Sequence, residues 1–196
     1  MVANIEKLVK VVDTFRQGSV MIIHVVRHAE AIERTREVPE EHRYLTPRGR
    51  KRFRKVAKGL DKLGTDLDVI LTSPMIRAVQ TADILAERLR YDGDLQVAAL
   101  LGPGFRPESL GELLGSHTQA KEIAIVGHEP DLGALAQALF STQGACTLPK
   151  GAVVSFKIAA AGQGEAQFLQ MVTGGANIIT SRKKALARLE AENTSK

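Results

Sequence analysis

The apolar stretch Ile22–Val26, which ends abruptly on Arg27 and His28, constrains the fold of this chain more than any other feature. Its isoleucine and valine residues are β-branched and are interrupted by a single histidine, which indicates a strand buried on both faces. In open α/β sheets, ligands bind at the C-terminal ends of such strands. A cation and an imidazole at this position therefore predict an α/β fold with a functional site at that edge, unless the strand simply ends in solvent.

The same arrangement recurs further along the chain. Val69–Leu71 is a short apolar strand, and a helix is predicted over Pro74–Arg90. Ser73 is a good N-cap, and Pro74 suits the first helical position. Arg77 then falls in the first turn, among backbone N–H groups that favour an anion. Because a cation opposes the helix dipole there, its position indicates a binding role.

A third strand, Ile123–Val126, is followed by Gly127 and His128, and a helix is predicted over Pro130–Phe140. If the three strands are parallel neighbours, their ends meet at one edge of the sheet. Four side chains then lie together: Arg27, His28, Arg77 and His128. Two guanidinium groups and two imidazoles near helix N-termini favour a dianion, most simply a phosphoryl group.

These three blocks resemble the histidine phosphatase superfamily, also called the phosphoglycerate mutase-like family. The matching residues are Arg27–Ala29, Ser73–Pro74 with Arg77–Thr81, and Gly127–His128. The resemblance runs from about Met21 to about Gln170, and the segments Leu45–Arg50 and Gly127–Leu132 look most like the SixA-type phosphohistidine phosphatases. It implies a three-layer α/β/α sandwich with a mostly parallel central sheet.

The chemistry that these residues suggest is a two-step phosphoryl transfer that needs neither a metal nor another cofactor. His28 attacks phosphorus in line and becomes a phosphohistidine, which water then hydrolyses. Arg27 and Arg77 hold the equatorial oxygens, over which charge is spread in the transition state, and His128 donates a further contact. The partner is accordingly a phosphorylated protein or a small phosphorylated substrate.

Two departures from the family pattern bear on the substrate. Ala29 replaces the glycine that follows the nucleophile, and no carboxylic acid is clearly placed to protonate a leaving alkoxide. Glu108 is the candidate acid, while Glu30 and Glu129 flank the histidines. Phosphohistidine needs no such acid, because the departing imidazole can carry its own proton near neutral pH.

We therefore expect a protein phosphohistidine phosphatase. The alternative is a small-molecule phosphomonoesterase that uses Glu108 as the acid. A third possibility, from a different class, is a non-catalytic phosphate-binding module that has kept the pocket.

Composition sets the remaining expectations. The chain has 196 residues, of which 44% are apolar and 25% charged, as in a globular domain. Its single cysteine, Cys146, excludes an intrachain disulfide and favours the cytoplasm. The basic residues behind the net charge of +5 are predicted to lie on solvated helix faces, and no nucleic-acid-binding motif accompanies them. No apolar stretch is long enough to span a membrane. We therefore expect neither nucleic acid nor membrane partners; the oligomeric state is not indicated.

A shared metal site is also not expected. His24 and His28 are four residues apart, but along a strand this separates them by roughly 13 Å at ~3.3 Å per residue. One metal ion cannot bridge that distance, so His24 is predicted to be a packed or hydrogen-bonded strand residue.

The chain divides into three parts. Residues 1–20 form an extension whose apolar residues recur at helical spacing, residues 21–180 form the phosphatase-like domain, and residues 181–196 form a polar C-terminal helix. The extension is an additional packing helix, an over-extended start or a helix for a partner or membrane surface. Within the domain, the remaining predicted elements are helices at 46–63 and 107–115 and a hairpin of strands at 153–158 and 167–172.

Overall fold

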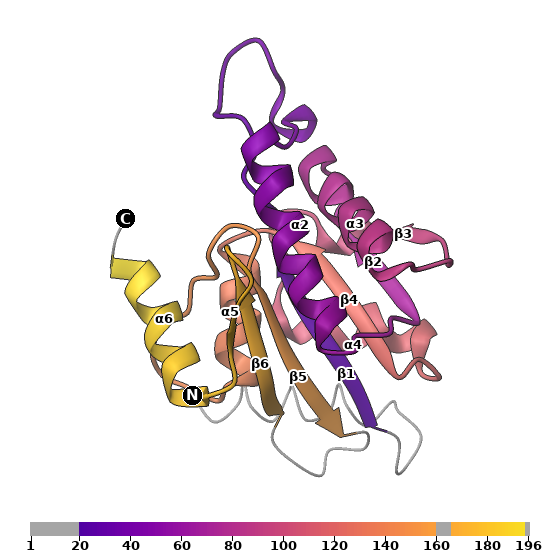
Figure 1. Ribbon diagram of the computed structural model, residues 1–196, viewed down its shortest axis with the longest axis vertical. Helices are drawn as coiled ribbons and strands as arrows, with labels where there is room; N and C mark the ends of the chain where they lie inside the picture. Colours follow the sequence, from indigo (N-terminus) through magenta and orange to yellow (C-terminus); the bar gives the residue numbers. More distant parts are fainter. Residues whose placement is uncertain (1–19, 160–165, 195–196) are drawn as a thin grey trace.

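The computed structural model describes residues 20–159 and 166–194, which form a seven-stranded sheet between layers of helices (Figure 1). The strand order is β3-β2-β4-β1-β5-β6-β7. The strands are β1 (Val20–Arg27), β2 (Val69–Thr72), β3 (Leu95–Val97), β4 (Glu122–Gly127), β5 (Val153–Ala159), β6 (Gln167–Thr173) and β7 (Asn177–Ile179). The helix predicted in residues 1–20 lies outside the described residues, apart from Val20, which begins β1.

The sheet is mixed. The pairs β1–β4, β2–β3 and β2–β4 are parallel, whereas β1–β5, β5–β6 and β6–β7 are antiparallel. Five strands therefore run in one direction, and only β5 and β7 oppose them. The predicted parallel neighbours and the predicted hairpin are both present, whereas the short edge strands β3 and β7 were not predicted.

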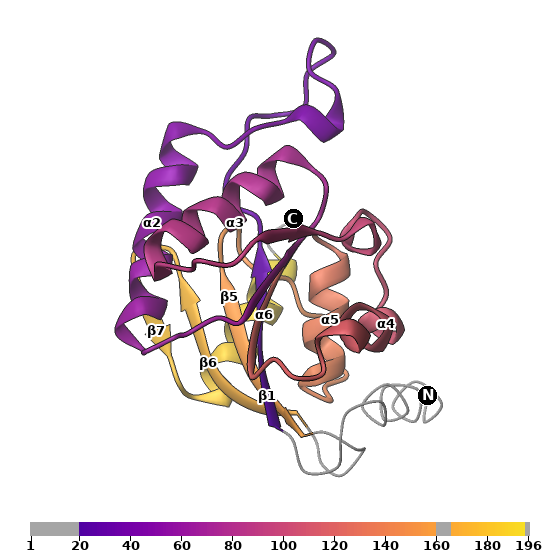
Figure 2. The same cartoon turned by 90° about the vertical axis from the view of Figure 1, so that its right-hand side faces the viewer.

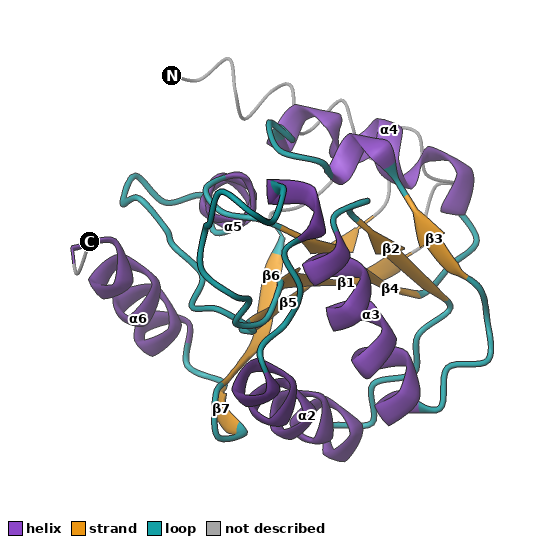
Figure 3. Cartoon of the chain, turned by 90° about the horizontal axis from the view of Figure 1, so that it is seen from above, coloured by secondary structure: helices purple, strands orange, loops and turns teal. Residues whose placement is uncertain are grey.

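Helices cover both faces of this sheet. The α-helices are α2 (Pro47–Lys62), α3 (Ile76–Leu89), α4 (Leu110–Leu114), α5 (Asp131–Leu139) and α6 (Arg182–Thr194). Short 3₁₀ helices are η1 (Glu40–His42), η2 (Ala99–Leu101), η3 (Pro107–Ser109) and η4 (Gly115–His117). Helices α2 and α3 lie on one side of the sheet, and α4 and α5 on the other (Figure 2 and Figure 3). The predicted three-layer α/β/α sandwich is thus confirmed.

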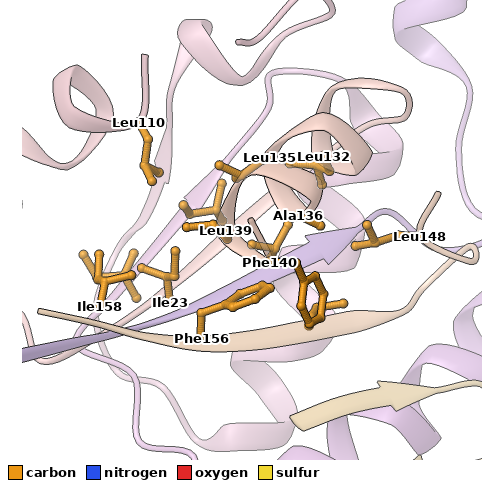
Figure 4. Close-up of a cluster of buried hydrophobic side chains, with 14 of the residues drawn as sticks. Ile23, Leu110, Leu132, Leu135, Ala136, Leu139, Phe140, Leu148, Phe156 and Ile158 are labelled. Atoms are coloured by element: carbon orange, nitrogen blue, oxygen red, sulfur yellow. The ribbon is translucent and has the colours of Figure 1, made fainter. Parts of the chain in front are cut away.

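The central strand β1 is buried on both faces, as its apolar run predicts. Ile23 and Val25 belong to the core on the α5 side, whereas Val26 belongs to the core under α2 and α3. On the α5 side, the rings of Phe140 and Phe156 meet edge to face with centroids 4.9 Å apart (Figure 4). This packing fixes the strand whose end carries Arg27 and His28.

Helix α2 begins as predicted and is held against the segment that follows β1. Thr46 caps it by accepting a hydrogen bond from the Gly49 backbone N–H at 2.8 Å, and Pro47 is the first helical residue. A Cβ atom at Gly49 would lie only 2.1 Å from the Glu30 carbonyl oxygen. Only glycine therefore permits this close approach between the helix and the tip of β1.

Two helix starts differ from the prediction. Helix α3 begins at Ile76 rather than at Pro74, and α5 begins at Asp131 rather than at Pro130. The predicted Ser73 cap is therefore wrong, although Arg77 still lies in the first turn of its helix. No helix in the described part of the chain is long and apolar enough to cross a membrane.

Candidate active site

The pairing register of three parallel strands brings the predicted residues together. Arg27 at the end of β1 is level with Gly127 at the end of β4, and Thr72 at the end of β2 is level with Val126. The next residue along each chain segment consequently emerges at the same edge of the sheet. These residues are His28, Ser73 and His128.

His28 is almost fully buried, and its two ring nitrogens have different partners. Nδ1 lies 2.7 Å from the Ala29 carbonyl oxygen, which can only accept a hydrogen bond, so Nδ1 carries the proton. The Nε–H of Arg77 donates to Nε2 at 3.2 Å, so Nε2 carries the lone pair. Two independent contacts thus indicate the same neutral tautomer, with the lone pair on Nε2.

Burial is the main cause of the altered titration of His28, lowering its pKa to about 3. The hydrogen bond to the Ala29 carbonyl raises the pKa, while His128, Arg77 and Arg27 lower it further. The imidazole is therefore neutral throughout the physiological range. A neutral imidazole is the form that can attack an electrophile.

Arg77 is buried, and all three of its guanidinium nitrogens have partners in the described structure. Besides the contact of Nε with His28, Nη1 donates to the Glu40 carbonyl oxygen at 2.7 Å, and Nη2 lies 2.9 Å from Glu40 Oε1. Thr81, further along α3, supports the neighbouring backbone, because its Oγ1 donates to the Arg77 carbonyl at 2.6 Å and accepts from the Ala29 N–H at 3.0 Å.

Arg27 is the second buried guanidinium of the site, with 8% of its surface exposed. Its Nη1 donates to the Leu148 carbonyl oxygen, and the Leu148 N–H donates to Glu129 Oε1 at 3.0 Å. Burial lowers the pKa of Arg27, whereas Glu129 and Glu192 raise it. Among the described residues its Nε atom has no hydrogen-bond partner, so this buried donor is available to a ligand.

His128 stands beside His28, with ring centroids 5.1 Å apart and planes inclined at 54°. Its Nε2 lies 2.7 Å from Ser73 Oγ, while Nδ1 is buried and has no partner within the described structure. Burial is the main reason that the pKa of His128 is lowered to about 4. The charge of Arg77 also lowers this pKa, that of Glu40 raises it, and that of Arg27 lowers it. The residue that sequence analysis assigned to a helix cap, Ser73, thus orients this ring instead.

A pocket of about 480 Å³ opens over these side chains. All four residues predicted for the site line it, and sequence analysis missed several others: Arg34, Arg43, Lys150, Glu33 and Glu40. Glu108 is not among the lining residues; it lies in η3, in the segment leading to α4. The structure therefore brings together Arg27, His28, Arg77 and His128 without Glu108.

Glu40 is a carboxylate of the pocket lining that contacts Arg77 directly. It accepts hydrogen bonds from Arg43 Nη1 at 2.9 and 3.1 Å and from Arg34 Nε at 3.0 Å, in addition to its contact with Arg77. Burial raises the pKa of Glu40, but the hydrogen bonds and charges of Arg43, Arg77 and Arg34 outweigh it and hold the pKa below the ordinary value. Glu40 is therefore an anion, and no sequence pattern marks it, because the 3₁₀ helix η1 that holds it has only three residues.

Other reactive groups have structural explanations. His24 is a hydrogen-bonded strand residue, as predicted, with Nδ1 2.8 Å from Ser155 Oγ and Nε2 2.7 Å from Glu122 Oε1. Burial raises the pKa of the Cys146 thiol to about 11, with Glu190 and Glu129 adding to the effect, so this thiol is unreactive near neutral pH. Within residues 20–159 and 166–194, no cluster of three or more metal-ligating side chains is present.

Comparison with known proteins identifies related sequences. Residues 23–101 match the sequence model of the histidine phosphatase superfamily (branch 1). An uncharacterized protein of Picosynechococcus sp. is 37% identical over 131 residues, which cover 61% of this chain and 73% of that protein. The mitochondrial serine/threonine-protein phosphatase Pgam5 of Drosophila ananassae is 37% identical over 70 residues, which cover 36% of this chain but only 24% of Pgam5.

The fold is shared with a solved structure. The protein histidine phosphatase SixA complexed with tungstate superimposes with a TM-score of 0.70 over 78% of this chain and 97% of SixA, at 21% sequence identity. At this level of identity the likeness establishes the fold. It confirms the phosphoglycerate mutase-like architecture that the sequence predicts.

Proposed function

Because this chain belongs to the histidine phosphatase superfamily, we propose that it is a phosphatase that removes the phosphoryl group from protein phosphohistidine through a covalent intermediate on His28. One observation carries the proposal. The contacts of Nδ1 with the Ala29 carbonyl and of Nε2 with Arg77 support a neutral His28 whose lone pair faces a strongly basic pocket. This is the protonation state that a nucleophilic imidazole requires.

In the first step, the Nε2 lone pair of His28 attacks phosphorus, and the bond from phosphorus to the substrate nitrogen breaks. The electron pair of that bond stays on the departing imidazole. In the second step, a water oxygen attacks the phosphorus on His28, releasing inorganic phosphate and restoring the Nε2 lone pair. Neither step changes an oxidation state, and both water protons leave on the phosphate as H2PO4⁻.

Fixed cations stabilise the charge on the phosphoryl oxygens. Arg27 offers the buried Nε donor that lacks a partner in the described structure, and Arg77 offers the two terminal nitrogens that now hold Glu40. The backbone N–H of Met75 lies 3.4 Å from Ser73 Oγ, so the hydroxyl proton is available to His128 Nε2. His128 Nδ1 then carries a proton, and His128 becomes the third residue that donates to the phosphoryl group.

The protonation states in the pocket favour a leaving group that needs no acid. Glu40 is held as a carboxylate by three arginines, and the candidate acid Glu108 does not line the pocket. An alkoxide is a poor leaving group without a neutral acid, whereas imidazole (unperturbed pKa about 6.5) leaves readily near neutral pH. The site accordingly suits cleavage of a phosphorus–nitrogen bond better than cleavage of a phosphate ester.

The test compares three substrates: a phosphohistidine protein, phosphoramidate and p-nitrophenyl phosphate. We expect turnover of both phosphorus–nitrogen substrates to exceed ester turnover, and rapid quenching in alkali to trap acid-labile phosphate on the enzyme. His28→Ala should abolish the trapped phosphate and all turnover.

Two results would change the assignment. Ester hydrolysis that equals or exceeds phosphohistidine turnover, and that is lost in Glu108→Gln, would establish a phosphomonoesterase. Phosphate binding without turnover of any of the three substrates would establish a non-catalytic binding module.

A further inference from the structure

A second cavity, of about 330 Å³, adjoins the proposed active site. Arg27 and Lys150 line both cavities, so the two spaces are neighbours on either side of these cations. The walls of the second cavity come from α2, from residues 149–151 and from α6. Helices α2 and α6 lie on opposite sides of β7, as Figure 3 shows.

Basic side chains dominate the rim of this second cavity. Arg52, Lys150 and Arg188 line it together with the carboxylates Glu30 and Glu192. Both carboxylates already have cationic neighbours on the same rim: Glu30 Oε2 lies 3.8 Å from Arg52 Nη1, and Glu192 Oε2 lies 3.5 Å from Arg188 Nη2.

Lys150 is an exposed cation of this rim that these carboxylates do not neutralise. Within the part of the chain that the structure describes, it has no ion pair, and it stands exposed between the two cavities. A substrate segment that leaves the active site towards the second cavity therefore passes an unpaired cation before it reaches Arg52 and Arg188.

The floor of the second cavity is apolar. The buried side chains of Phe53 and Val56 form part of it. Gly151, with φ +72°, brings a backbone turn so close that a Cβ atom would lie 3.3 Å from the Phe53 ring. An apolar floor beneath a basic rim suits the side chain of an acidic residue, whose methylene groups contact the floor while its carboxylate meets the cations.

We propose that this second cavity binds an acidic side chain of the phosphorylated protein, close to the phosphorylated residue, while the phosphoryl group occupies the pocket over His28. The inference rests on the proposed function, since it assigns a substrate feature to the same enzyme. It predicts that protein substrates with acidic residues near the phosphohistidine are preferred over small phosphorus–nitrogen compounds.

The test uses the full chain with the double substitution Arg52→Gln and Arg188→Gln. Arg54→Gln is the matched control, because Arg54 lies on the same helix, is similarly exposed and faces Glu87 at 3.9 Å instead of the second cavity. The readout is the ratio of kcat/KM for a phosphohistidine protein to kcat/KM for phosphoramidate, which is too small to span both cavities. We expect the double variant to lower this ratio about tenfold, through KM, as the loss of two exposed ion pairs allows.

A second measurement keeps the result independent of any effect on folding. Poly-glutamate should inhibit the unmodified chain competitively against the phosphoprotein, and this inhibition should weaken in the double variant but not in Arg54→Gln. An unchanged ratio, or equal inhibition of all three proteins, overturns the proposed subsite. If the unmodified chain turns over neither substrate, the proposed function itself fails, which is a distinguishable outcome.

Discussion

At the scale of single residues, the hydroxyl group of Ser73 has a larger role than its position in the sequence indicates. Ser73 and His128 are both buried, and Ser73 Oγ lies 2.7 Å from Nε2 of the imidazole. Ser73→Ala would leave both ring nitrogens of His128 without a partner among the described residues. An unsatisfied buried polar group costs about 1–3 kcal/mol, and the ring is free to turn away from the substrate.

We therefore expect Ser73→Ala to lower kcat roughly tenfold, which corresponds to about 1.4 kcal/mol of transition-state stabilisation. Steady-state kinetics with phosphoramidate measure this effect. Ser116→Ala, at an exposed position in η4, is the control and should keep full activity. A Ser73→Ala enzyme with undiminished kcat would show that His128 does not depend on this hydrogen bond.

The two site histidines also make stability depend on pH. Burial lowers their folded-state pKa values to about 3 for His28 and about 4 for His128, below the unfolded value of about 6.5. Below pH 6.5 these two histidines bind protons in the unfolded chain, whereas in the folded chain they remain neutral until the pH approaches their lowered pKa values. The free energy of unfolding therefore falls as the pH decreases through 6.5 towards the folded pKa values.

At pH 5 this loss amounts to roughly 2 kcal/mol for each histidine. Urea unfolding at pH 7.5 and pH 5 measures it. Between these pH values, the free energy of unfolding of the double variant His28→Ala and His128→Ala should fall by about 4 kcal/mol less than that of the unmodified chain. For His42→Ala, which changes an exposed side chain, it should fall as much as for the unmodified chain. Equal pH dependence in all three proteins would contradict the buried, neutral state of the site histidines.

Sequence reasoning located the four residues that converge in the candidate site because each follows a predicted element boundary. Arg27, His28 and His128 follow apolar strands, and Arg77 lies in the first turn of the helix that follows another strand. Because these strands are parallel neighbours, their C-terminal ends meet at one edge of the sheet and the four side chains converge there. Glu40 belongs to a three-residue 3₁₀ helix and Lys150 to an irregular segment, and no periodicity locates either residue. Their positions depend on tertiary contacts that only the structure shows.

At the scale of elements, the segment 32–45 forms a projection above the C-terminal edge of the sheet, at the top of Figure 1. Within it, η1 places Glu40 against Arg77 through both its carboxylate and its carbonyl oxygen. In the proposed function a bound phosphoryl group uses the same guanidinium, so the Glu40 carboxylate would compete with the phosphoryl group and repel it.

We therefore expect Glu40→Gln to strengthen inhibition by inorganic phosphate about fivefold, since close like charges near a protein surface oppose binding by one or more kcal/mol. Inhibition constants against phosphoramidate turnover measure the change. Glu41→Gln is the control, because Glu41 is exposed and is the neighbouring residue in η1. Weaker phosphate inhibition in Glu40→Gln would instead mean that the carboxylate positions Arg77 for the ligand.

The elements that sequence reasoning missed or misplaced have physical explanations. Strands β3 and β7 each contain three residues, too few for an alternating pattern to be detected. The start of α3 is misplaced because a good capping residue followed by proline signals a helix, but the Ser73 hydroxyl bonds to His128 from across the sheet edge. Helix-capping rules consider only residues that are close in the sequence, so they do not include a hydrogen bond to a distant residue such as His128.

At the scale of the whole molecule, the C-terminal helix α6 contributes to the core. Ala185 and Leu189 are fully buried there, although the composition of the helix predicts a polar element. The Thr147 N–H donates to the Leu189 carbonyl at 3.1 Å, and Arg182 Nη2 donates to the Phe140 carbonyl at 2.6 Å. Because six of the thirteen residues of this helix are charged, the sequence does not indicate that its apolar positions are buried.

Since Leu189 shares its core with Phe140 and Leu148, whose backbone also holds Arg27, we expect α6 to unfold together with the domain. Leu189→Ala should lower the free energy of unfolding by about 2–5 kcal/mol, the usual cost of a leucine cavity, in a single transition. Denaturant unfolding followed by circular dichroism measures this change, with Lys184→Ala, an exposed position on the same helix, as the control. A loss confined to a small early transition would show instead that α6 melts independently, and the second cavity, which Arg188 helps to line, would then lack a stable wall.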